Sequence, residues 1–485
     1  MNKLAIGFFA VASLCTFSSA VADEVTTCVQ QFLSDAHYEI GVVDGQAGRR
    51  TFAAAKLLQS RYKMLDLPEL SSETMNQWCE KLSSDAGQMI LTQRSILGTV
   101  AMSEQEGPAD FWSADNRTDV CFGASFQRGA SFRVPLMDTT PAFTESIAAG
   151  IKPIFPPAPG APECDMTGGG NPPKPLIDAG ITGDYHGGSD WVPFEPSYLF
   201  LSRTLAAYRY AATPELTQSL VTFLTEWASA NALSQNIYFP GSSRLDFHVL
   251  SVLPGAIIAF SEVADAMSME EKMVVGKWLT RLVDVTGKSP FMDRQDNKAY
   301  LVAYIVMLWG VLIDEPSMID AGIEAYKNAI YDMRPDGSFP VDSGRGGSGL
   351  HYSNRSTMMM VALATLGDVV DADLHEFTSS GRSLKDAVEW MVASSKFPEL
   401  NQRHALSCPD GGDGNGSSIA SPELAHVLNG SMRVWVTPYL MSGKVDDDLS
   451  ATLQSGPYGN AARGMSEVRV GGPLACFAAG IYGQD

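Results

Sequence analysis

Residues 296–352 hold the stretch that decides the fold. It begins with the polar segment DNKAY at 296–300, which opens the apolar run AYLVAYIVMLWGVLI at 299–313. It ends with GRGGSGLHY at 344–352, which leads into a second apolar run, MMMVALATL at 358–366. Two buried helices are predicted, each preceded by polar residues. Helix N-termini carry partial positive charge and unbonded N–H donors, so the end of the bundle where both helices begin favours an anionic ligand.

Helical spacing of apolar residues continues outward from this stretch in both directions. Short breaks such as TPE at 213–215 and DEPS at 314–317 separate the segments, and very apolar segments alternate with amphipathic ones. This pattern predicts an all-α fold, an incomplete (α/α) toroid of antiparallel hairpins with an inner and an outer ring. The run at 299–313 is shorter than the ~20 residues needed to cross a bilayer. The predicted helices cover residues 197–212, 215–233, 249–267, 270–285, 299–313, 317–333, 356–370, 383–395 and 421–440.

The N-terminal part of the chain has a different character. Residues 1–22 have a basic start, an apolar stretch and the small-x-small sequence AVA at 20–22, which predicts a secretory signal peptide and a periplasmic or secreted protein. Residues 23–485 are then expected to form one domain. Within it, helices are predicted at 25–36 and 46–62, and the Pro- and Gly-rich residues 111–193 predict an ordered irregular insertion near the cleft.

Six cysteines remain after the predicted cleavage. An even number in an exported chain indicates disulfides, with 15 possible pairings. We favour Cys28 with Cys79 and Cys408 with Cys476. Cys121 and Cys164 lie where they could pin the insertion at both ends.

The charge balance restricts the partners. The chain has a net charge of −21, and loss of residues 1–22 would remove only one lysine, which leaves −22. Nucleic acid is therefore excluded, and no membrane contact is expected after signal removal. A polyanionic substrate requires that Arg and Lys gather in one cleft, because exposed charges beyond about 10 Å are screened at moderate salt. We expect a monomer.

No cofactor or metal is predicted. The cysteine spacings fit no zinc pattern. The oxygen-rich segment CPDGGDGNGSS at 408–418 contains Asp410, Asp413 and Asn415 but lacks calcium-loop spacing, so it is interpreted as a turn.

Two motifs resemble those of the mannuronate-specific alginate lyases. In that family Asn-Asn-His-x-Tyr begins one helix, and an Arg lies seven positions before the Tyr of a Leu-x-Tyr-His motif that begins another. Here DNKAY at 296–300 occupies the first motif, and Arg345 and Tyr352 keep the second spacing. The likeness extends over residues 198–441. It implies the same toroid and a polysaccharide lyase activity.

The chain departs from the family pattern at two positions. Lys298 stands where the family has His, and Ser353 stands where the family usually has another His. An ammonium at Lys298 can hold charge better than it can transfer a proton. The alternative is an ion pair with Asp293 or Asp296 that keeps Lys298 out of catalysis.

Cleavage of a uronate polymer by β-elimination explains the residue types in these motifs. The C5 proton is removed next to a carboxylate, whose charge must first be neutralised by nearby donors. Asn297, Arg345 and Lys298 suit that task, and a guanidinium can bind a carboxylate through two hydrogen bonds. Tyr352 suits proton transfer, and one phenol can serve as base and acid when the C5 hydrogen and C4 oxygen lie on one face of the ring, as they do in mannuronate.

Further residues are candidates for substrate binding. Ser60-Arg61-Tyr62 is similar to a lid element of the family, and aromatic or basic residues in predicted loops could contact sugar rings. The alternative for each of them is a charge exposed to solvent or a side chain packed in the core. His351 also suits the role of orienting its helix. The candidates are Arg61, Tyr62, Trp191, Arg244, His248, Tyr300 and His351, with Tyr238 and Phe247 beside them.

Three functions remain open from the sequence. The first is an exported lyase of a polyuronate, most readily mannuronate-rich alginate, with glucuronan as an alternative because glucuronate differs from mannuronate only at C2. The second is a non-catalytic polysaccharide-binding or export protein on the same scaffold. The third is a hydrolase, which needs two opposed carboxylates, and the motifs offer only Asp293, Asp296 and Asp342.

Overall fold

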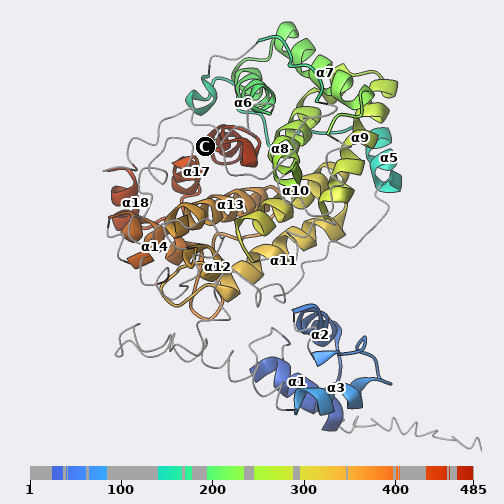
Figure 1. Ribbon diagram of the computed structural model, residues 1–485, viewed down its shortest axis with the longest axis vertical. Coiled ribbons are helices and arrows are strands. Elements are labelled where there is room, and N and C mark those ends of the chain that lie inside the picture. The colour runs from blue at the N-terminus through green and yellow to red at the C-terminus, as the bar shows by residue number, and fades with distance from the viewer. Residues whose placement is uncertain are drawn as a thin grey trace, which may run out of the picture. The chain divides into compact units, whose positions relative to one another are not determined.

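The computed structural model of the chain divides into two compact units. Unit 1 comprises Met1–Gln59 and Lys63–Ser95, and unit 2 comprises Ser60–Tyr62 and Ile96–Asp485, whereas the sequence pattern treats residues 23–485 as one domain. Figure 1 shows the helices of both units. The structure describes residues 24–35, 40, 42–61, 65–84, 140–166, 170–176, 194–233, 245–287, 295–345, 348–396, 400–401, 404, 433–455, 458 and 467–483.

Unit 1 contains the helices α1 (Glu24–Asp35), α2 (Arg49–Arg61, whose last two residues belong to unit 2) and α3 (Met75–Leu82). The buried side chains of α1 and α3 include Phe32 and Trp78, and the predicted disulfide Cys28–Cys79 joins these two helices. Gln30 is a buried amide that accepts the backbone N–H of Gly45 at 2.8 Å, so it holds the following loop against α1.

Unit 2 is built from helical hairpins, which confirms the predicted all-α toroid class. The members of each hairpin contact each other, and the first members α6, α8, α10 and α13 also contact one another in that order (Figure 1). Among the described residues, β-structure is limited to two isolated bridges. The hairpins are α6 (Glu195–Tyr210) with α7 (Pro214–Ser229), α8 (Leu245–Val263) with α9 (Met269–Gly287), α10 (Asn297–Ile313) with α11 (Pro316–Asp332), and α13 (Gly349–Val369) with α14 (Leu384–Lys396).

Shorter helices complete unit 2. They are α5 (Thr140–Ala149), α12 (Pro340–Ser343), α17 (Val436–Met441), α18 (Asp447–Leu453) and α20 (Leu474–Tyr482), together with the 3₁₀ turns η4 (Pro162–Cys164), η5 (Ala264–Ala266) and η9 (Val468–Val470).

The α10–α11 hairpin shows how the inner and outer rings arise. Every residue of α10 except Lys298 and Val311 is buried. In α11 the buried residues recur at helical spacing on one face. A Cβ added at Gly322 would lie 2.5 Å from Cβ of Met307, so the glycine lets the two helices approach closely. The apolar stretch Val249–Ala266 is long enough to cross a membrane by composition, yet 83% of it is buried within the protein.

Capping residues define where the inner helix begins and ends. Asp296 is the N-cap of α10, and one carboxylate oxygen accepts the N–H groups of Lys298 and Ala299 at 3.0 and 3.3 Å. Asp314 ends the helix in the left-handed conformation with φ 53°. Pro316 is the first residue of α11, where a missing N–H costs nothing.

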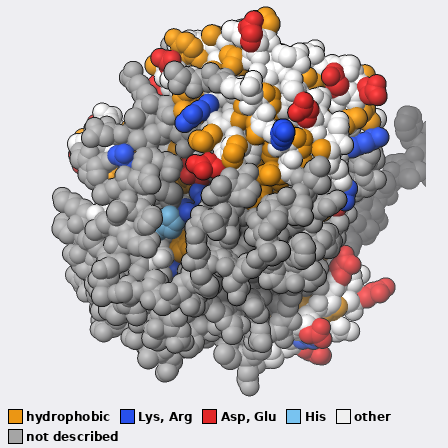
Figure 2. Space-filling view, turned by 45° about the horizontal axis from the view of Figure 1, so that its top comes forward, with side chains coloured by type: hydrophobic (Ala, Val, Ile, Leu, Met, Phe, Trp, Pro, Cys, Tyr) orange, Lys and Arg blue, Asp and Glu red, His pale blue; other side chains and the backbone are white. Residues whose placement is uncertain are grey.

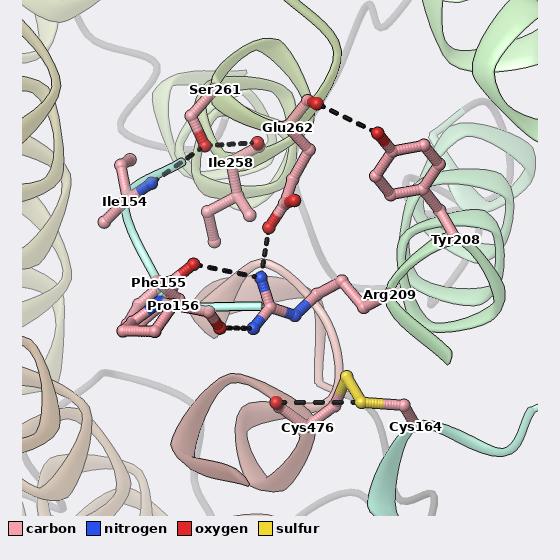
Figure 3. Close-up of polar contacts among 10 residues, drawn as sticks. All are labelled: Ile154, Phe155, Pro156, Cys164, Tyr208, Arg209, Ile258, Ser261, Glu262 and Cys476. Carbon is pink, nitrogen blue, oxygen red and sulfur yellow. Dashed lines mark hydrogen bonds and ion pairs between the residues drawn. A yellow bond between two sulfur atoms is a disulfide. The ribbon is translucent and has the colours of Figure 1, made fainter. Parts of the chain in front are cut away.

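The expected irregular insertion at 111–193 is only partly irregular. Helix α5 lies inside this segment. The ring of Phe143 in α5 stacks on the ring of Trp309 in α10, with 5.8 Å between the ring centroids. Residues 151–166 contain only the η4 turn and are held by buried contacts (Figure 3). Arg209 of α6 donates to the carbonyls of Phe155 and Pro156 at 3.3 and 2.6 Å and forms an ion pair with Glu262 of α8.

One predicted disulfide was wrong. Cys476 pairs with Cys164, not with Cys408, and Cys164 therefore does not pin the insertion together with Cys121 (Figure 3). The reason is the apolar helix α20, which the sequence pattern did not predict and which carries Cys476 to the η4 turn. Cys121 and Cys408 lie outside the described residues.

Candidate functional site

The candidate site lies where the N-terminus of α10, the short helix α12 and the first turns of α13 meet. Asp342 of α12 is fully buried and accepts two hydrogen bonds from Asn297. The backbone N–H of Asn297 donates to Oδ2 of Asp342 at 3.0 Å, and Nδ2 of Asn297 donates to Oδ1 at 2.8 Å. Ser356 of α13 donates its hydroxyl to the same Oδ2. One carboxylate thus joins three helices.

Burial controls the acidity of this carboxylate. Loss of hydration and the nearby charge of Asp296 raise the pKa of Asp342 to about 6, while Arg345, Ser356 and Asn297 act in the opposite direction. Such a carboxylate is expensive to keep charged. Its hydrogen bonds to Asn297 and Ser356 offset part of that cost.

Arg345 and Tyr352 form the second half of the site. The guanidinium carbon of Arg345 lies 3.4 Å from the ring centroid of Tyr352, which is a close cation–π contact. Arg345 is 3% exposed, whereas Tyr352 is partly exposed. Arg355 lies 5.6 Å from the same ring centroid, so two guanidinium groups lie near the phenol. The N–H groups of a guanidinium lie in its plane, so stacking does not occupy them.

Hydrogen bonds from one arginine hold the turn that precedes α13. Arg334 is buried and donates to Ser338 Oγ at 3.1 Å, to the Pro340 carbonyl at 3.3 Å and to Ser343 Oγ. A Cβ at Gly349 would lie 2.5 Å from the Ser343 carbonyl oxygen, so only glycine allows α13 to start there. This glycine therefore lets the helix that carries Tyr352 begin directly against α12.

The other predicted site residues lie at several places. Lys298 is partly buried in the first turn of α10, beside Asn297. Tyr300 is in the core, where its ring packs on Phe339 at 5.9 Å and its hydroxyl donates to the Gln295 carbonyl at 3.3 Å. The ring of His351 meets the Tyr352 ring edge-on at 5.2 Å. Ser353, at the second departure from the family motif, is fully buried.

The remaining candidates lie outside the described part of the chain. Arg61 and His248 belong to α2 and α8, but their side chains are not described. Neither the backbone nor the side chain is described for Tyr62, Trp191, Tyr238, Arg244 and the segment 408–418. The same is true of Asp293, the other candidate partner of Lys298. Among the residues that the structure does describe, no three His, Cys, Asp or Glu side chains are arranged to hold a metal ion.

No local sequence pattern distinguished Asp342, Ser356 and Arg355 as candidate site residues. Asp342 was considered only as a carboxylate for hydrolysis, and its contact with Asn297 spans 45 residues. One signal was available, because Asp342 is the only acidic residue between Phe339 and Tyr352. In Figure 2 a His side chain, Lys or Arg side chains and an acidic side chain lie close together on one face.

Comparison with known proteins is consistent with this geometry. The family model described as alginate lyase matches residues 203–400. A polysaccharide lyase of Stenotrophomonas maltophilia (strain K279a) is 21% identical over 245 residues, which cover 46% of this chain and 73% of that protein. An alginate lyase of Pseudomonas syringae pv. syringae (strain B728a) is 24% identical, and the match covers 42% of this chain but only 55% of that enzyme.

Solved structures show the same fold. Alginate lyase A1-III in complex with a tetrasaccharide has a TM-score of 0.53 at 17% identity, over 73% of this chain and 99% of that one. Alginate lyase A1-III from Sphingomonas species A1 has a TM-score of 0.51 at 17% identity, over the same shares of the two chains. The described helices, the motif spacing and the matching family domain agree. Residues 203–400, which include the N-terminus of α10, α12 and the first turns of α13, are therefore similar to the alginate lyase family of polysaccharide lyases.

Proposed function

We propose that this protein is an exported lyase that cleaves mannuronate-rich alginate by β-elimination. The observation that carries the proposal is a chain of contacts that links Asn297, Arg345 and Tyr352: Asp342 binds Asn297 and the backbone N–H of Arg345, and the Arg345 guanidinium stacks on Tyr352. The three linked groups are an amide, a guanidinium and a phenol, which are the groups that elimination from a uronate requires.

Neutralisation of the substrate carboxylate is the first task. A carboxylate activates the neighbouring C5–H bond poorly until donors withdraw its charge. Asn297 stands at the N-terminus of α10, where the helix dipole adds positive potential. Arg345 supplies a full positive charge close to the same helix end. Both groups are nearly buried, so their interactions with a bound carboxylate would be weakly screened.

Proton transfer is assigned to Tyr352. The guanidinium of Arg345 stacks on its ring and so fixes the position of the phenol. The Tyr352 oxygen takes the C5 proton, and the electrons of the C5–H bond form the C4–C5 double bond. The bond between C4 and the glycosidic oxygen breaks. The protonated phenol then donates to that oxygen on the same face of the ring.

Lys298 is assigned to charge rather than to proton transfer. It is one residue beyond Asn297 and only partly buried, so its ammonium can approach the substrate from the solvent side. An ion pair with a neighbouring carboxylate remains the alternative role, because the N-cap Asp296 lies two residues before it.

The choice of polymer rests on the relatives and on stereochemistry. The matched proteins from Pseudomonas are called alginate lyases, and the structural relative was solved with a tetrasaccharide. Glucuronate has the same arrangement at C4 and C5, so elimination by one phenol also permits glucuronan. Export is supported by the disulfides Cys28–Cys79 and Cys164–Cys476, which persist in oxidising compartments.

The proposal is tested by incubation of the purified protein with mannuronan, guluronan and glucuronan in parallel. Elimination creates an unsaturated uronate that absorbs near the ultraviolet edge, hydrolysis creates reducing ends without that absorbance, and a binding protein creates neither. We expect unsaturated product, fastest from mannuronan. New reducing ends without absorbance, or no product from any polymer, would contradict the proposal.

A further inference from the structure

Within the described part of the candidate site, the proposed mechanism assigns no task to the buried carboxylate of Asp342. It is fully buried, and it contacts all three parts of the site. Its carboxylate binds Asn297, its backbone carbonyl accepts the N–H of Arg345 at 3.2 Å, and its Oδ2 accepts the hydroxyl of Ser356. Ser356 lies one helical turn beyond Tyr352 on α13, so Asp342 also holds the helix that carries the phenol.

The contact with Asn297 determines which way the amide faces. An amide side chain can rotate by half a turn and exchange its oxygen for its NH₂ group. An ionised carboxylate only accepts hydrogen bonds, so the group that faces Asp342 must be the NH₂ group. The backbone N–H of the same residue binds the other carboxylate oxygen. Because the backbone N–H and one Nδ2–H of Asn297 are held by one planar carboxylate, the direction of the second Nδ2–H is set.

We propose that Asp342 is a positioning residue of the active site, which holds the Asn297 amide so that its second N–H points at the uronate carboxylate. The proposal rests on the proposed lyase function. It explains why the core retains a carboxylate whose charge is disfavoured by burial and by Asp296. A neutral amide at position 342 would present its own NH₂ group to one donor of Asn297. The Asn297 amide would then turn or move.

A merely structural role predicts a different outcome. If Asp342 only held helices together, its replacement would lower stability and activity together. In the folded protein the raised pKa means that the charged form is the costly one, and this cost is present in full above pH 6 and disappears as the pH falls below the ordinary aspartate value. Asp342→Asn removes that cost. It should therefore reduce turnover without a comparable loss of stability at pH 8.

The experiment compares Asp342→Asn with the control Asp368→Asn. Asp368 is a partly buried carboxylate on the same helix as Tyr352, and it accepts a hydrogen bond from Tyr482. It lies 16 residues beyond Tyr352, which corresponds to about 24 Å along the helix. A third variant, Ser356→Ala, removes only one contact to Asp342.

For Asp342→Asn we expect a kcat on mannuronan about 10- to 100-fold below that of the wild type, because a misplaced Asn297 amide would slow the reaction by about that factor. KM should change by less than about threefold, because the charges that attract substrate remain. The midpoint of thermal unfolding at pH 8 should fall no further than in Asp368→Asn, whose kcat should equal that of the wild type. Ser356→Ala should lie between the two.

The pH profile gives an independent result. The groups that face Asp342 are Asp296 and Asn297 of α10, Arg345 after α12, and Ser356 of α13. Protonation of Asp342 removes its charge-assisted hold on Asn297, so wild-type kcat should fall as the pH drops through about 6. This step should be missing from Asp342→Asn. An unchanged kcat or an unchanged acid step in Asp342→Asn would overturn the proposal.

Failure of the proposed function can be told from failure of this inference by calorimetric binding of a mannuronate tetrasaccharide. If the wild type binds the sugar but forms no unsaturated product, the lyase function is wrong. A binding enthalpy that changes in Asp342→Asn alone would then still support positioning of Asn297, and equal enthalpies for the wild type, Asp342→Asn and Asp368→Asn would overturn it. A wild type that neither binds nor cleaves overturns both.

Discussion

At the scale of single residues, Tyr352 is the side chain whose loss should separate binding from turnover. The Tyr352→Phe variant keeps the ring on which Arg345 stacks but loses the hydroxyl. We expect kcat on mannuronan to fall by at least about 1000-fold, since a proton-transfer group contributes roughly 100- to 10,000-fold. Calorimetric binding of a mannuronate tetrasaccharide should stay within about threefold, because cation–π attraction persists in Phe.

Tyr482→Phe is the matched control for this prediction. Its hydroxyl donates to Asp368 at the far end of α13, so the variant also loses a bonded phenolic hydroxyl. Turnover by this control should equal that of the wild type. A kcat of Tyr352→Phe within about tenfold of that of the wild type would remove Tyr352 from the mechanism.

Lys298 offers a second test at this scale. Lys298→His restores the family residue beside Asn297. If the ammonium contacts substrate, the variant should cleave mannuronan at a rate within about tenfold of the wild type but with a changed ratio of mannuronan to glucuronan rates, because charge and reach both change. Initial rates on both polymers measure this ratio. An unaltered rate and ratio would favour the ion-pair role for Lys298.

Residue types and spacing predicted most of the candidate site, for a physical reason. Arg345 and Tyr352 are close in the chain, and the start of α10 is marked by its own capping residue, so local patterns identify them. Asp342 was not assigned a role because its contact with Asn297 depends on tertiary packing of α12 against α10 and α13. Charge alone did not distinguish it from a surface aspartate.

At the scale of elements, long helices were predicted well and short ones poorly. The predicted segments 270–285, 317–333 and 383–395 differ by one or two residues at each end from α9, α11 and α14. Helix α13 begins at Gly349, seven residues earlier than predicted, because its first turns are polar and carry the site residues. The short helices α5, α12 and α20 have too few turns for a clear hydrophobic period.

The disulfide Cys164–Cys476 should determine the stability of α20. It is buried, and it connects this C-terminal helix with a turn 312 residues earlier in the chain. Replacement of both cysteines by serine removes the cross-link and puts two hydroxyl groups into an apolar site. We expect amide hydrogen exchange in residues 474–482 to become at least about tenfold faster, as a loss of 1.4 kcal/mol or more would produce.

Cys28→Ser with Cys79→Ser is the control for that prediction. Its disulfide lies in unit 1, so exchange in α20 should be unchanged while exchange in α1 and α3 accelerates. Protection of α20 that survives loss of Cys164–Cys476 would mean that packing of Phe477 on Phe155 and the Arg209 contacts suffice to hold it.

At the scale of the whole molecule, the net charge opposes the proposed substrate. The chain has 34 basic and 55 acidic residues, yet the candidate site has Arg345 and Arg355 near the Tyr352 ring and Lys298 in the first turn of α10. Long-range repulsion and short-range attraction respond differently to salt. The Debye length falls from about 30 Å at 0.01 M to about 8 Å at 0.15 M, so repulsion by the distant acidic surface is screened first.

The expected result is a KM for mannuronan that falls at least about threefold when KCl is raised from 0.01 to 0.15 M, because screening of the acidic surface eases encounter with the polyanion. The chemical step takes place among nearly buried groups, so kcat should change by less than about twofold. A mannuronate trisaccharide, which carries few charges, is the control substrate and should show a much smaller salt effect. A KM that rises over the same range would mean that attraction by the basic groups near Tyr352 outweighs the net charge of the protein, as it does for polyanion-binding clefts of basic proteins.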